Sequence, residues 1–398
     1  MQERVIDRIL NTEIKIKNVG LKVIDVAFVL CLLVFAFMIR FKLMPIESAD
    51  FFGFLKEWMQ MIRENGGFRS LSMEISNYTS PYMYIMTFLS YVSTNDLYAL
   101  KLVSIFFDYM AALAIFLIVL EMTGNIKKSI LGMAVLLLSP TVILDSAYWC
   151  QCDIIYTCFL LYSFYYFLKD DSKKSLIFFA ISFAFKLQSL FLLPFYIIMW
   201  LKKKTIQLRH LVWIPIIYFM SALPAWAAGR SLWDLLSIYL DQSGTYIWGT
   251  LEYPNLYALL GEAMPDMRHA AEVSGAGMYA TIMILGCIAY YFYNKNVMLT
   301  QELEVTLALF LVAITVYGLP HMHDRYGFLI DLLGIVYGIY RVKRFPVTCG
   351  FMLVSVLTFM PYLIGVHIVP IQYLAIGQLA LIIYVGYDLY KQIQENTI

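Results

Sequence analysis

The sequence predicts an all-α protein, a polytopic bundle of transmembrane helices. Of its 398 residues, 61% are hydrophobic and only 14% are charged, whereas an average soluble domain is about 45–50% apolar and about 25% charged. The apolar residues also form runs close to the roughly 20 residues that a helix needs to cross the hydrocarbon core. Because backbone groups in lipid must be paired within the spanning segment, these runs predict helices in one domain over residues 1–398.

The elements follow from the hydropathy in chain order. Residues 1–21 are polar with interspersed apolar residues, which predicts an amphipathic helix on the cytoplasmic surface. The stretch 175–200 is apolar, but Lys186 and Gln188 interrupt it, which predicts two half-helices that enter the membrane and return. Counting these halves, we expect about 12 membrane segments. The remaining predicted spans are 22–40, 97–121, 129–148, 153–168, 210–228, 272–293, 304–319, 325–340, 348–366 and 371–390.

The distribution of Lys and Arg predicts the orientation. Basic residues occur in the N-terminal segment and in the connections 127–128, 169–174, 202–204 and 341–344. Because cytoplasmic loops are enriched in basic residues, these connections and both termini are expected in the cytoplasm. The membrane itself is expected to be a bacterial plasma membrane, which the charge distribution does not address. The net charge of +1 gives no indication of a nucleic-acid partner.

The opposite, external side then receives the two long loops. Loop 41–96 is expected to carry interfacial helices, one of them over 82–94. Loop 229–271 carries the polar residues Gln242 and Asn255, and its side of the membrane alone suggests that it would contact a substrate bound there, the acceptor in the case of a transfer reaction. The shorter turns 149–153 and 320–325 lie on the same side.

Polar residues at membrane depth are costly and often functional. Glu47 and Asp50 open the first loop, and an aromatic run with Trp58 follows. This pattern predicts a surface helix with Asp50 at its start. The alternative, given even weight, is that Asp50 only caps this helix.

Two further polar groups occur on the external side. Asn77 and Tyr78 belong either to a substrate loop or to an aromatic belt at the membrane surface. Trp149, Gln151 and Asp153 join two spans, with Asp153 as a helix cap or an inward-facing group. Asp108 and Asp145 are expected to pair with a neighbouring basic residue or with helix-end amides.

Lys186 and Gln188 lie between the half-helices, where a cation is well placed to meet a lipid phosphate; a structural ion pair is the alternative. The densest polar cluster is the segment 320–326, with His321, His323 and Arg325. As a metal site it is incomplete without further ligands. As an anion clamp it is better suited, because Arg and His both bind phosphate oxygens.

Taken together, these segments resemble the GT-C superfamily of membrane glycosyltransferases that use polyprenyl-phosphate sugars, including the dolichyl-phosphate-glucose glucosyltransferases. Two departures from the motifs of that superfamily are Cys150 in place of Gly and Asp324 in place of Glu. The resemblance covers roughly residues 20–345. The matching residues are Asp50, Trp58, the looser segment 77–81, Trp149, Gln151, Asp153, Lys186, Gln188, His321, His323, Asp324, Arg325 and Tyr326.

The resemblance implies an inverting transfer of a hexose from a polyprenyl-phosphate carrier to a lipid-linked glycan or a cell-envelope polysaccharide. Asp50 would be the general base, and Arg325, His323 and Lys186 would be the cations that stabilise the phosphate leaving group. No cofactor and no metal are expected, so activity should survive chelation. The donor phosphate would bind Lys186, Gln188, His321, His323 and Arg325, with support from Glu47, Asn77, Tyr78, Trp149, Gln151, Asp153, Asp324 and Tyr326.

Two other function classes stay open from the sequence. A transporter or flippase of lipid-linked sugars would share the spans, the broken helix and the intramembrane Lys186. A non-catalytic membrane partner in an envelope-assembly complex would explain the aromatic richness. It would not explain why His, Asp and Arg cluster on one side.

Overall fold

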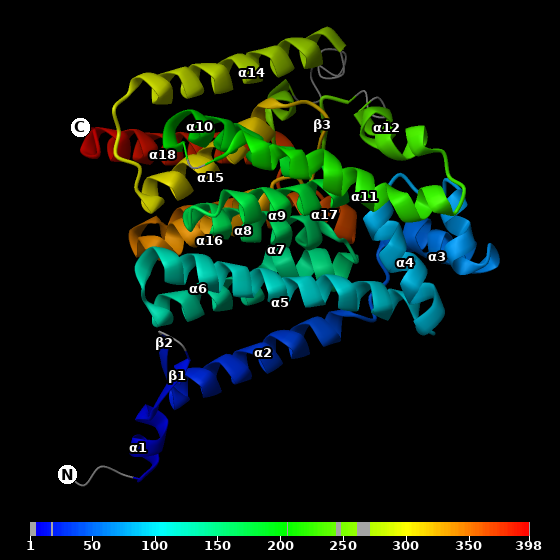
Figure 1. The fold of residues 1–398 in the computed structure, drawn as a ribbon, viewed down its shortest axis with the longest axis horizontal. Coiled ribbons are helices and arrows are strands. Elements are labelled where there is room, and N and C mark those ends of the chain that lie inside the picture. Colours follow the sequence, from blue (N-terminus) through cyan, green and yellow to red (C-terminus); the bar gives the residue numbers. More distant parts are fainter. Residues whose placement is uncertain (1–4, 17–18, 205, 244–247, 261–270, 398) are drawn as a thin grey trace.

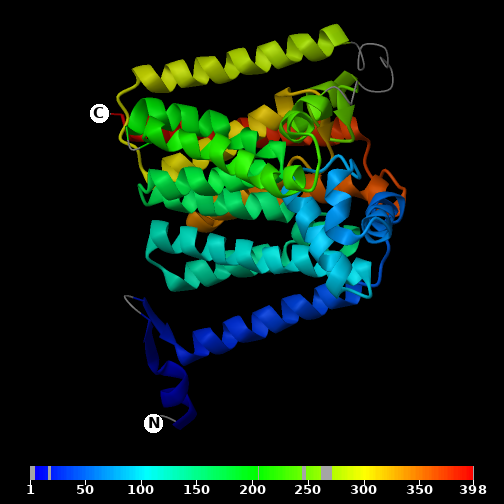
Figure 2. The same cartoon turned by 45° about the vertical axis from the view of Figure 1, so that its right-hand side comes forward.

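A computed structural model describes residues 5–16, 19–204, 206–243, 248–260 and 271–397. Long helices lie side by side in one bundle, with α2 and α14 along opposite faces (Figures 1 and 2). Among the described residues, seven helices are long and apolar enough to cross a membrane, or eight if the pair Ile126–Leu138 and Pro140–Trp149, bent by 45°, counts as one span. The protein is therefore an all-α integral membrane protein, as the composition predicts.

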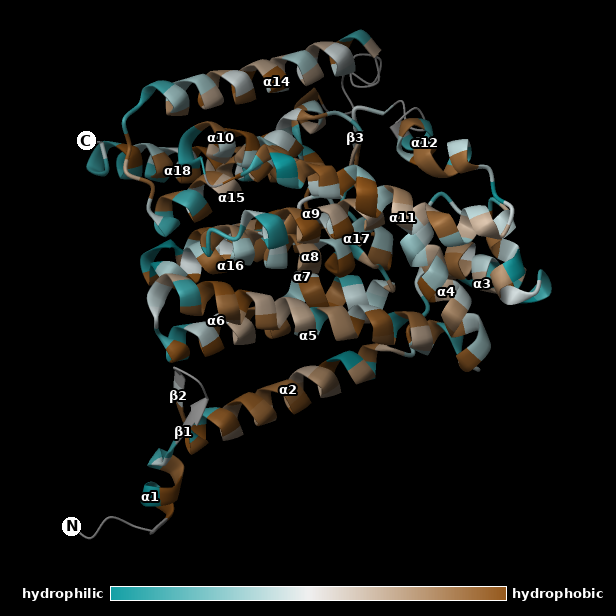
Figure 3. Ribbon diagram, in the orientation of Figure 1, coloured by the Kyte–Doolittle hydropathy of each residue, from teal (hydrophilic) through white to brown (hydrophobic). Residues whose placement is uncertain are grey.

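These long helices are apolar along most of their length, and polar residues gather near their ends (Figure 3). Two of them begin with a 3-10 turn, η5 (Leu208–Val212) before α11 and η7 (Val342–Arg344) before α17. The seven are α2 (Val23–Leu43), α5 (Asp96–Thr123), α11 (Trp213–Ala227), α14 (Ala271–Asn294), α15 (Gln301–Gly318), α17 (Phe345–Ile364) and α18 (Ile371–Glu395).

Shorter elements complete the bundle and its two ends. The bent span and the short apolar helices are α6 (Ile126–Leu138), α7 (Pro140–Ile143), the π-helix η3 (Leu144–Trp149), α8 (Asp153–Leu168) and α16 (Phe328–Tyr340). The first loop carries the π-helix η1 (Phe51–Leu55), α3 (Lys56–Glu64), η2 (Gly67–Ser72) and α4 (Ser80–Val92). Loop 229–271 carries α12 (Leu232–Ser243), β3 (Thr250–Leu251) and η6 (Leu256–Leu260), and its residues 244–247 and 261–270 lie outside the described part of the chain.

The N-terminal segment differs from its prediction. Helix α1 covers only Val5–Asn11, and an antiparallel hairpin of β1 (Glu13–Ile16) and β2 (Val19–Lys22) follows, with Glu13 opposite Lys22. A single helix over 1–21 is therefore wrong. The sequence of β1 alternates charged and apolar residues, and this period of two suits a strand and not a helix.

The broken helix turns back on itself, as the sequence predicts. Helix α9 (Ser172–Phe185) stops where Lys186 adopts an extended backbone, and η4 (Leu187–Leu192) and α10 (Leu193–Lys203) follow. At the far end of α10, Lys203 Nζ lies 2.9 Å from Asp170 Oδ1, directly before α9 begins. Both arms therefore share one end of the bundle, and Lys186 lies at the other.

The basic connections gather at the end of the bundle that contains Lys203. There Lys203 Nζ also lies 2.9 Å from Glu304 Oε1. Arg344 Nη1 contacts Glu302 Oε1 at 2.7 Å, and Lys128 donates to the carbonyl of Tyr340. Basic groups from segments far apart in sequence thus form one paired, charged end of the molecule.

Helix α2 lies at the edge of the bundle and is attached by buried polar contacts. Arg40 Nε donates to Asp108 Oδ2 of α5 at 2.7 Å, and both side chains are fully buried. Lys101 of α5 donates to the carbonyl of Ile46 at 2.6 Å, just beyond the C-terminus of α2. The expected pairing of Asp108 with a basic residue is confirmed. Asp145, in contrast, is buried with both carboxylate oxygens lacking a hydrogen-bond partner among the described residues.

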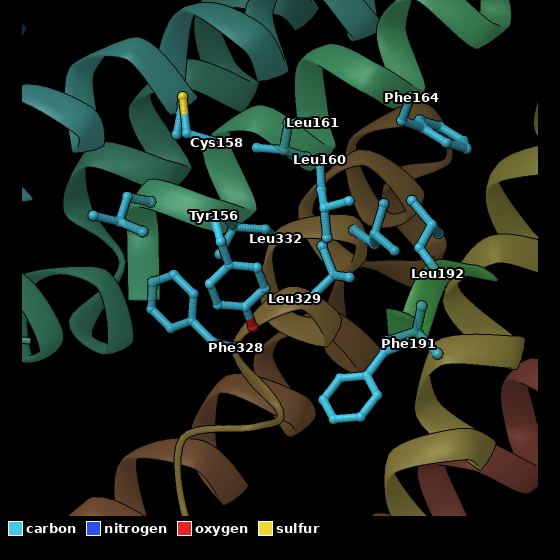
Figure 4. Packing of buried hydrophobic residues seen from close by; sticks show 14 of the residues in the cluster. Tyr156, Cys158, Leu160, Leu161, Phe164, Phe191, Leu192, Phe328, Leu329 and Leu332 are labelled. Atoms are coloured by element: carbon cyan, nitrogen blue, oxygen red, sulfur yellow. The ribbon is translucent and has the colours of Figure 1, made fainter. Parts of the chain in front are cut away.

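Apolar side chains of α8, α16 and η4 fill the centre of the bundle. Figure 4 shows them interdigitating between the helices, with the rings of Tyr156 and Phe328 next to each other. Tyr156, Leu160, Leu329 and Leu332 are all at most 1% exposed. This rigid apolar packing supports the polar groups described next.

Candidate functional site

Asp50 lies where the chain leaves α2 and enters η1. Its carboxylate makes no capping hydrogen bond. Ser48 performs that role instead, because its Oγ accepts from the backbone N–H of Phe51 at 3.1 Å. Asp50 Oδ2 accepts a hydrogen bond from Gln151 Nε2 at 2.5 Å and lies 4.0 Å from Arg325 Nη1. The interpretation of Asp50 as a mere helix cap is therefore wrong.

The turn between η3 and α8 positions Gln151 and Asp153. Cys150 adopts a left-handed backbone conformation, with φ at 68°, which reverses the chain after the buried Trp149. Ser48 Oγ donates to the carbonyl of Trp149 at 2.5 Å, and Ser104 Oγ donates to that of Gln151 at 2.6 Å. These bonds fix the turn to the first loop and to α5.

Asp153 joins the two cations of the site. Its carboxylate is fully buried at the start of α8, where Oδ1 accepts from Lys186 Nζ at 2.5 Å. Its other oxygen lies 3.8 Å from Arg325 Nη1. Both predicted alternatives for Lys186 are thus compatible with its position, because it is paired with Asp153 and also lines a cavity.

Arg325 is the centre of the cluster. Its guanidinium lies 4.9 Å above the ring of Trp149 and 3.8–4.0 Å from the carboxylates of Asp50, Asp153 and Asp324. These separations are too long for hydrogen bonds, and Nε and Nη1 have no hydrogen-bond partner among the described residues. The guanidinium is held in place while some of its N–H donors stay available, and these could bind an anion.

The segment around Arg325 is fixed by a short parallel pairing of β3 with β4 (Met322–His323), in which Leu251 lies opposite His323. Next to it, the N–H of Asp324 donates to the carbonyl of Leu251 at 3.0 Å. His321 Nδ1 donates to the carbonyl of Trp248 at 2.7 Å. Residues of loop 229–271, which are distant in sequence, therefore hold the segment 320–326 in position.

Burial shifts the pKa values of this segment. Burial, with Arg325 and Lys186 nearby, lowers the pKa of His323 to about 3, which favours its neutral form. This direction counts against the charged role that the resemblance gives to His323. Burial also raises the pKa of Asp324 to about 7, although Arg325 opposes the shift.

Two cavities meet at this cluster. The Lys186 cavity, of about 330 Å³, is lined by Lys186 and Gln188 and by apolar residues of α9 and η4. The Asp50 cavity, of about 690 Å³, is lined by Asp50, Gln151 and Asp324. The residues that line both cavities are Asn77, Tyr78, His323 and Arg325.

The segment 77–79 forms part of the wall between the cavities. Tyr78 packs against Tyr82 and Trp58, with ring centroids 4.9 and 5.7 Å apart. Thr79 Oγ1 donates to the carbonyl of Phe185 at 2.8 Å, at the end of α9. A side chain of loop 229–271, Gln242, donates to the carbonyl of Asn77 at 2.5 Å. The wall is therefore bonded to elements on the Lys186 side.

Most of the predicted site residues come together here. Gln188, His321 and Tyr326 line the Lys186 cavity, and Trp149 lines the Asp50 cavity. Glu47 does not join them, since it is exposed and is not among the described residues that line either cavity.

Loop 229–271 is only partly as expected. Gln242 lines the Lys186 cavity and not the Asp50 cavity. Asn255 is fully buried, and its side-chain amide donates hydrogen bonds to the carbonyls of Gly249 and Leu319. The prediction that Asn255 contacts an acceptor is therefore wrong.

Several lining residues were not predicted. Glu74 and Tyr362 line the Asp50 cavity, and Tyr239 lines the Lys186 cavity. Glu74 could have been found as an acidic residue in the predicted catalytic loop. Tyr362 comes from the distant helix α17, and nothing local in the sequence marks it.

Among the described residues, no group of three or more His, Cys, Asp and Glu side chains is placed to hold a metal ion. No protein-family model matches the chain, and a search of curated proteins finds no significant match. Function is therefore argued from the geometry of the site.

Proposed function

We propose that this protein is an inverting GT-C-type glycosyltransferase that moves a hexose from a polyprenyl phosphate to a lipid-linked glycan or a cell-envelope polysaccharide. One observation carries the proposal. Two cavities meet at Arg325, with the Asp50 carboxylate in one and Lys186 in the other. A transfer between two substrates needs this arrangement, because the donor and the acceptor must approach one reacting carbon from opposite sides.

The donor phosphate would occupy the Lys186 cavity. Lys186 and Arg325 supply positive charge there, and Gln188 and His321 supply further polar groups. Phe185, Leu190 and Phe191 provide apolar surface for the first part of the prenyl chain. As the bond from the sugar carbon to the phosphate oxygen breaks, its electron pair goes to that oxygen, and the two cations stabilise the charge.

The acceptor hydroxyl would enter the Asp50 cavity. Asp50 takes its proton while the oxygen forms a bond to the sugar carbon, so one bond forms as the other breaks and the carbon inverts. Gln151 holds one carboxylate oxygen, which leaves the other for the acceptor. General base catalysis of this kind contributes about 10²–10⁴-fold to the rate.

Translocation of lipid-linked sugars is the alternative, because a broken helix with a buried lysine is also typical of transporters. The packing behind the site favours transfer. Lys186 Nζ lies 5.7 Å from the ring of Tyr156, and beyond that ring the bundle is filled with apolar side chains such as Leu160 and Leu332 (Figure 4). A headgroup on its way across the membrane would need polar surroundings there.

The finer topology belongs to the same proposal. We place both termini and the paired basic end of the bundle in the cytoplasm, and the two cavities on the external side. The concentration of Lys and Arg at one end supports this orientation. Counting α9 and α10 separately, with η4 between them, the chain makes about 12 passages.

The test is sugar transfer by purified protein in nanodiscs, with a panel of polyprenyl-phosphate sugars and a membrane extract as the acceptor source. We expect transfer from one donor, and a fall of about 10²-fold or more with Asp50→Asn. The variant should still bind that donor, because Asp50 lies outside the Lys186 cavity and does not contact the phosphate.

Glu57→Gln is the matched control, since Glu57 is an exposed carboxylate in the same loop and should leave transfer unchanged. Thermal unfolding of each variant checks that it is folded. Transfer that survives Asp50→Asn at the wild-type rate would reject Asp50 as the base. Movement of labelled lipid-linked sugar across sealed vesicles without transfer would favour the translocase instead.

A further inference from the structure

The two cavities differ in charge. The Lys186 cavity is lined by Lys186 and Arg325 and, among the described residues, by no Asp or Glu. The Asp50 cavity is lined by the carboxylates of Asp50, Glu74 and Asp324, with Arg325 as its one Lys or Arg among the described lining residues. One side of the site therefore suits an anion, and the other side has more carboxylates than cations.

One guanidinium cannot balance these carboxylates. Arg325 forms long ion pairs with Asp50 at 4.0 Å and with Asp324 at 3.8 Å, and it is shared with Asp153. A phosphate in the Lys186 cavity would compete for the same positive charge. The carboxylates of the Asp50 cavity therefore carry more negative charge than Arg325 supplies in positive charge.

One of these carboxylates has an unused oxygen. The side chain of Asp324 is 2% exposed, and its Oδ2 has no hydrogen-bond partner among the described residues. Buried polar atoms in folded proteins almost always have a partner, so this carboxyl group has unused capacity to interact with a positive charge. Asp324 is among the residues that line the Asp50 cavity.

Aromatic rings complete the lining. Trp58, Phe54 and Tyr362 line the cavity. Such rings pack against the apolar faces of sugar rings, and their faces also attract cations. The combination of aromatic faces with excess carboxylate is suited to a sugar that is positively charged.

We propose that the acceptor is a sugar that carries an ammonium group near its reacting hydroxyl. The ammonium is attracted by the carboxyl groups of Asp324 and Glu74, and the hydroxyl faces Asp50. The same carboxylates repel a uronic acid. The role of this sugar as acceptor rests on the proposed transfer, whereas the binding preference can be measured without any turnover.

The experiment compares three ligands that differ in one group: the octyl glycosides of glucosamine, glucose and glucuronic acid. Their affinities are measured on the full-length protein in nanodiscs by quenching of tryptophan fluorescence, since Trp58 and Trp149 line the cavity. We expect the glucosaminide to bind about tenfold more tightly than the glucoside, and the glucuronide to bind most weakly.

Three variants assign the preference to this cavity. Glu74→Gln and Asp324→Asn should each reduce the ratio of glucosaminide to glucoside affinity several-fold. Glu57→Gln, which removes an exposed carboxylate outside the cavity, should leave that ratio unchanged. Thermal unfolding of each variant shows that it is folded.

Equal binding of the three glycosides, no saturable binding by any of them, or a preference untouched by both cavity variants would overturn the proposal. Preferential binding of the glucosaminide without transfer from any donor would support the binding site and would count against the proposed glycosyltransferase. Transfer to the glucoside or the glucuronide in preference to the glucosaminide would support the proposed glycosyltransferase and would reject the preference for an ammonium sugar.

Discussion

At the scale of single residues, Cys150 shows how a motif can change while its backbone stays the same. The resemblance places a Gly at this position, and Cys150 adopts the left-handed conformation in which Gly has no Cβ penalty. For another residue this conformation costs about 1–2 kcal/mol. Cys150 is also buried, so its thiol fills space that a Gly would leave empty.

Substitution of Cys150 tests this explanation. Cys150→Gly should change the free energy of unfolding by less than about 1 kcal/mol, because the relief of strain offsets the lost packing and the greater freedom of the unfolded chain. Cys150→Val should destabilise more, since a β-branched residue tolerates positive φ poorly. Unfolding in detergent, followed by circular dichroism, measures both variants. A Val variant as stable as the Gly variant would contradict the role of the backbone.

The identity of the charged residues in the site was more predictable from the sequence than their protonation states. Asp50, Lys186 and Arg325 stand out because charged residues are rare in apolar surroundings, and the structure brings them together. The lowered pKa of His323 was not predictable, because it depends on burial and on Lys186 from another segment as well as on the neighbouring Arg325. The exposure of Glu47 likewise depends on which way the first turn after α2 faces.

At the scale of elements, helix α2 depends on a buried ion pair. Arg40→Met should destabilise the protein by about 3–5 kcal/mol, because Asp108 would be left charged and unpaired in the interior. The double variant Arg40→Met with Asp108→Asn should recover most of that loss, since no buried charge remains unpaired. Unfolding of the single and double variants in detergent provides the comparison. A double variant less stable than Arg40→Met would show that the pair itself is strongly stabilising.

The positions of the helices were predictable from hydropathy. The breaks between helix segments were predictable only where a polar residue interrupted an apolar run. Lys186 and Gln188 mark the turn between α9 and α10. The bend of 45° between α6 and the segment Pro140–Trp149 occurs at Pro140, a residue that often breaks helices. Averaging hydropathy over a window conceals such a single residue. The N-terminal hairpin was missed because a few alternating residues are a weak signal beside a helical neighbour.

At the scale of the whole molecule, charge divides the bundle into two ends. Apolar composition predicted the bundle, and the spacing of basic residues predicted which connections lie together. The cavities were not predictable in shape, because their walls combine segments from distant parts of the chain. Tyr78, Gln188, Arg325 and Tyr362 are examples. The volumes of the cavities depend on how loops pack on the finished bundle.

The two ends should face different compartments. Glu57→Cys lies in the first loop at the site end, and Lys343→Cys lies beside Arg344 at the basic end. In intact cells, a membrane-impermeant maleimide should label the Glu57→Cys variant and leave the Lys343→Cys variant unlabelled until the cells are opened. The wild-type protein, with three exposed and three buried cysteines, provides the background. The opposite pattern would invert the proposed orientation.

Arg325 lines both cavities, so neither can be filled without consequence for the other. A charge that enters one cavity changes the electrostatic potential in its neighbour through the shared guanidinium. The two binding equilibria are then linked, and linkage is reciprocal: whatever factor the occupant of one cavity applies to the affinity of the second, the second applies to the first. One side chain thus couples the occupancy of two neighbouring cavities.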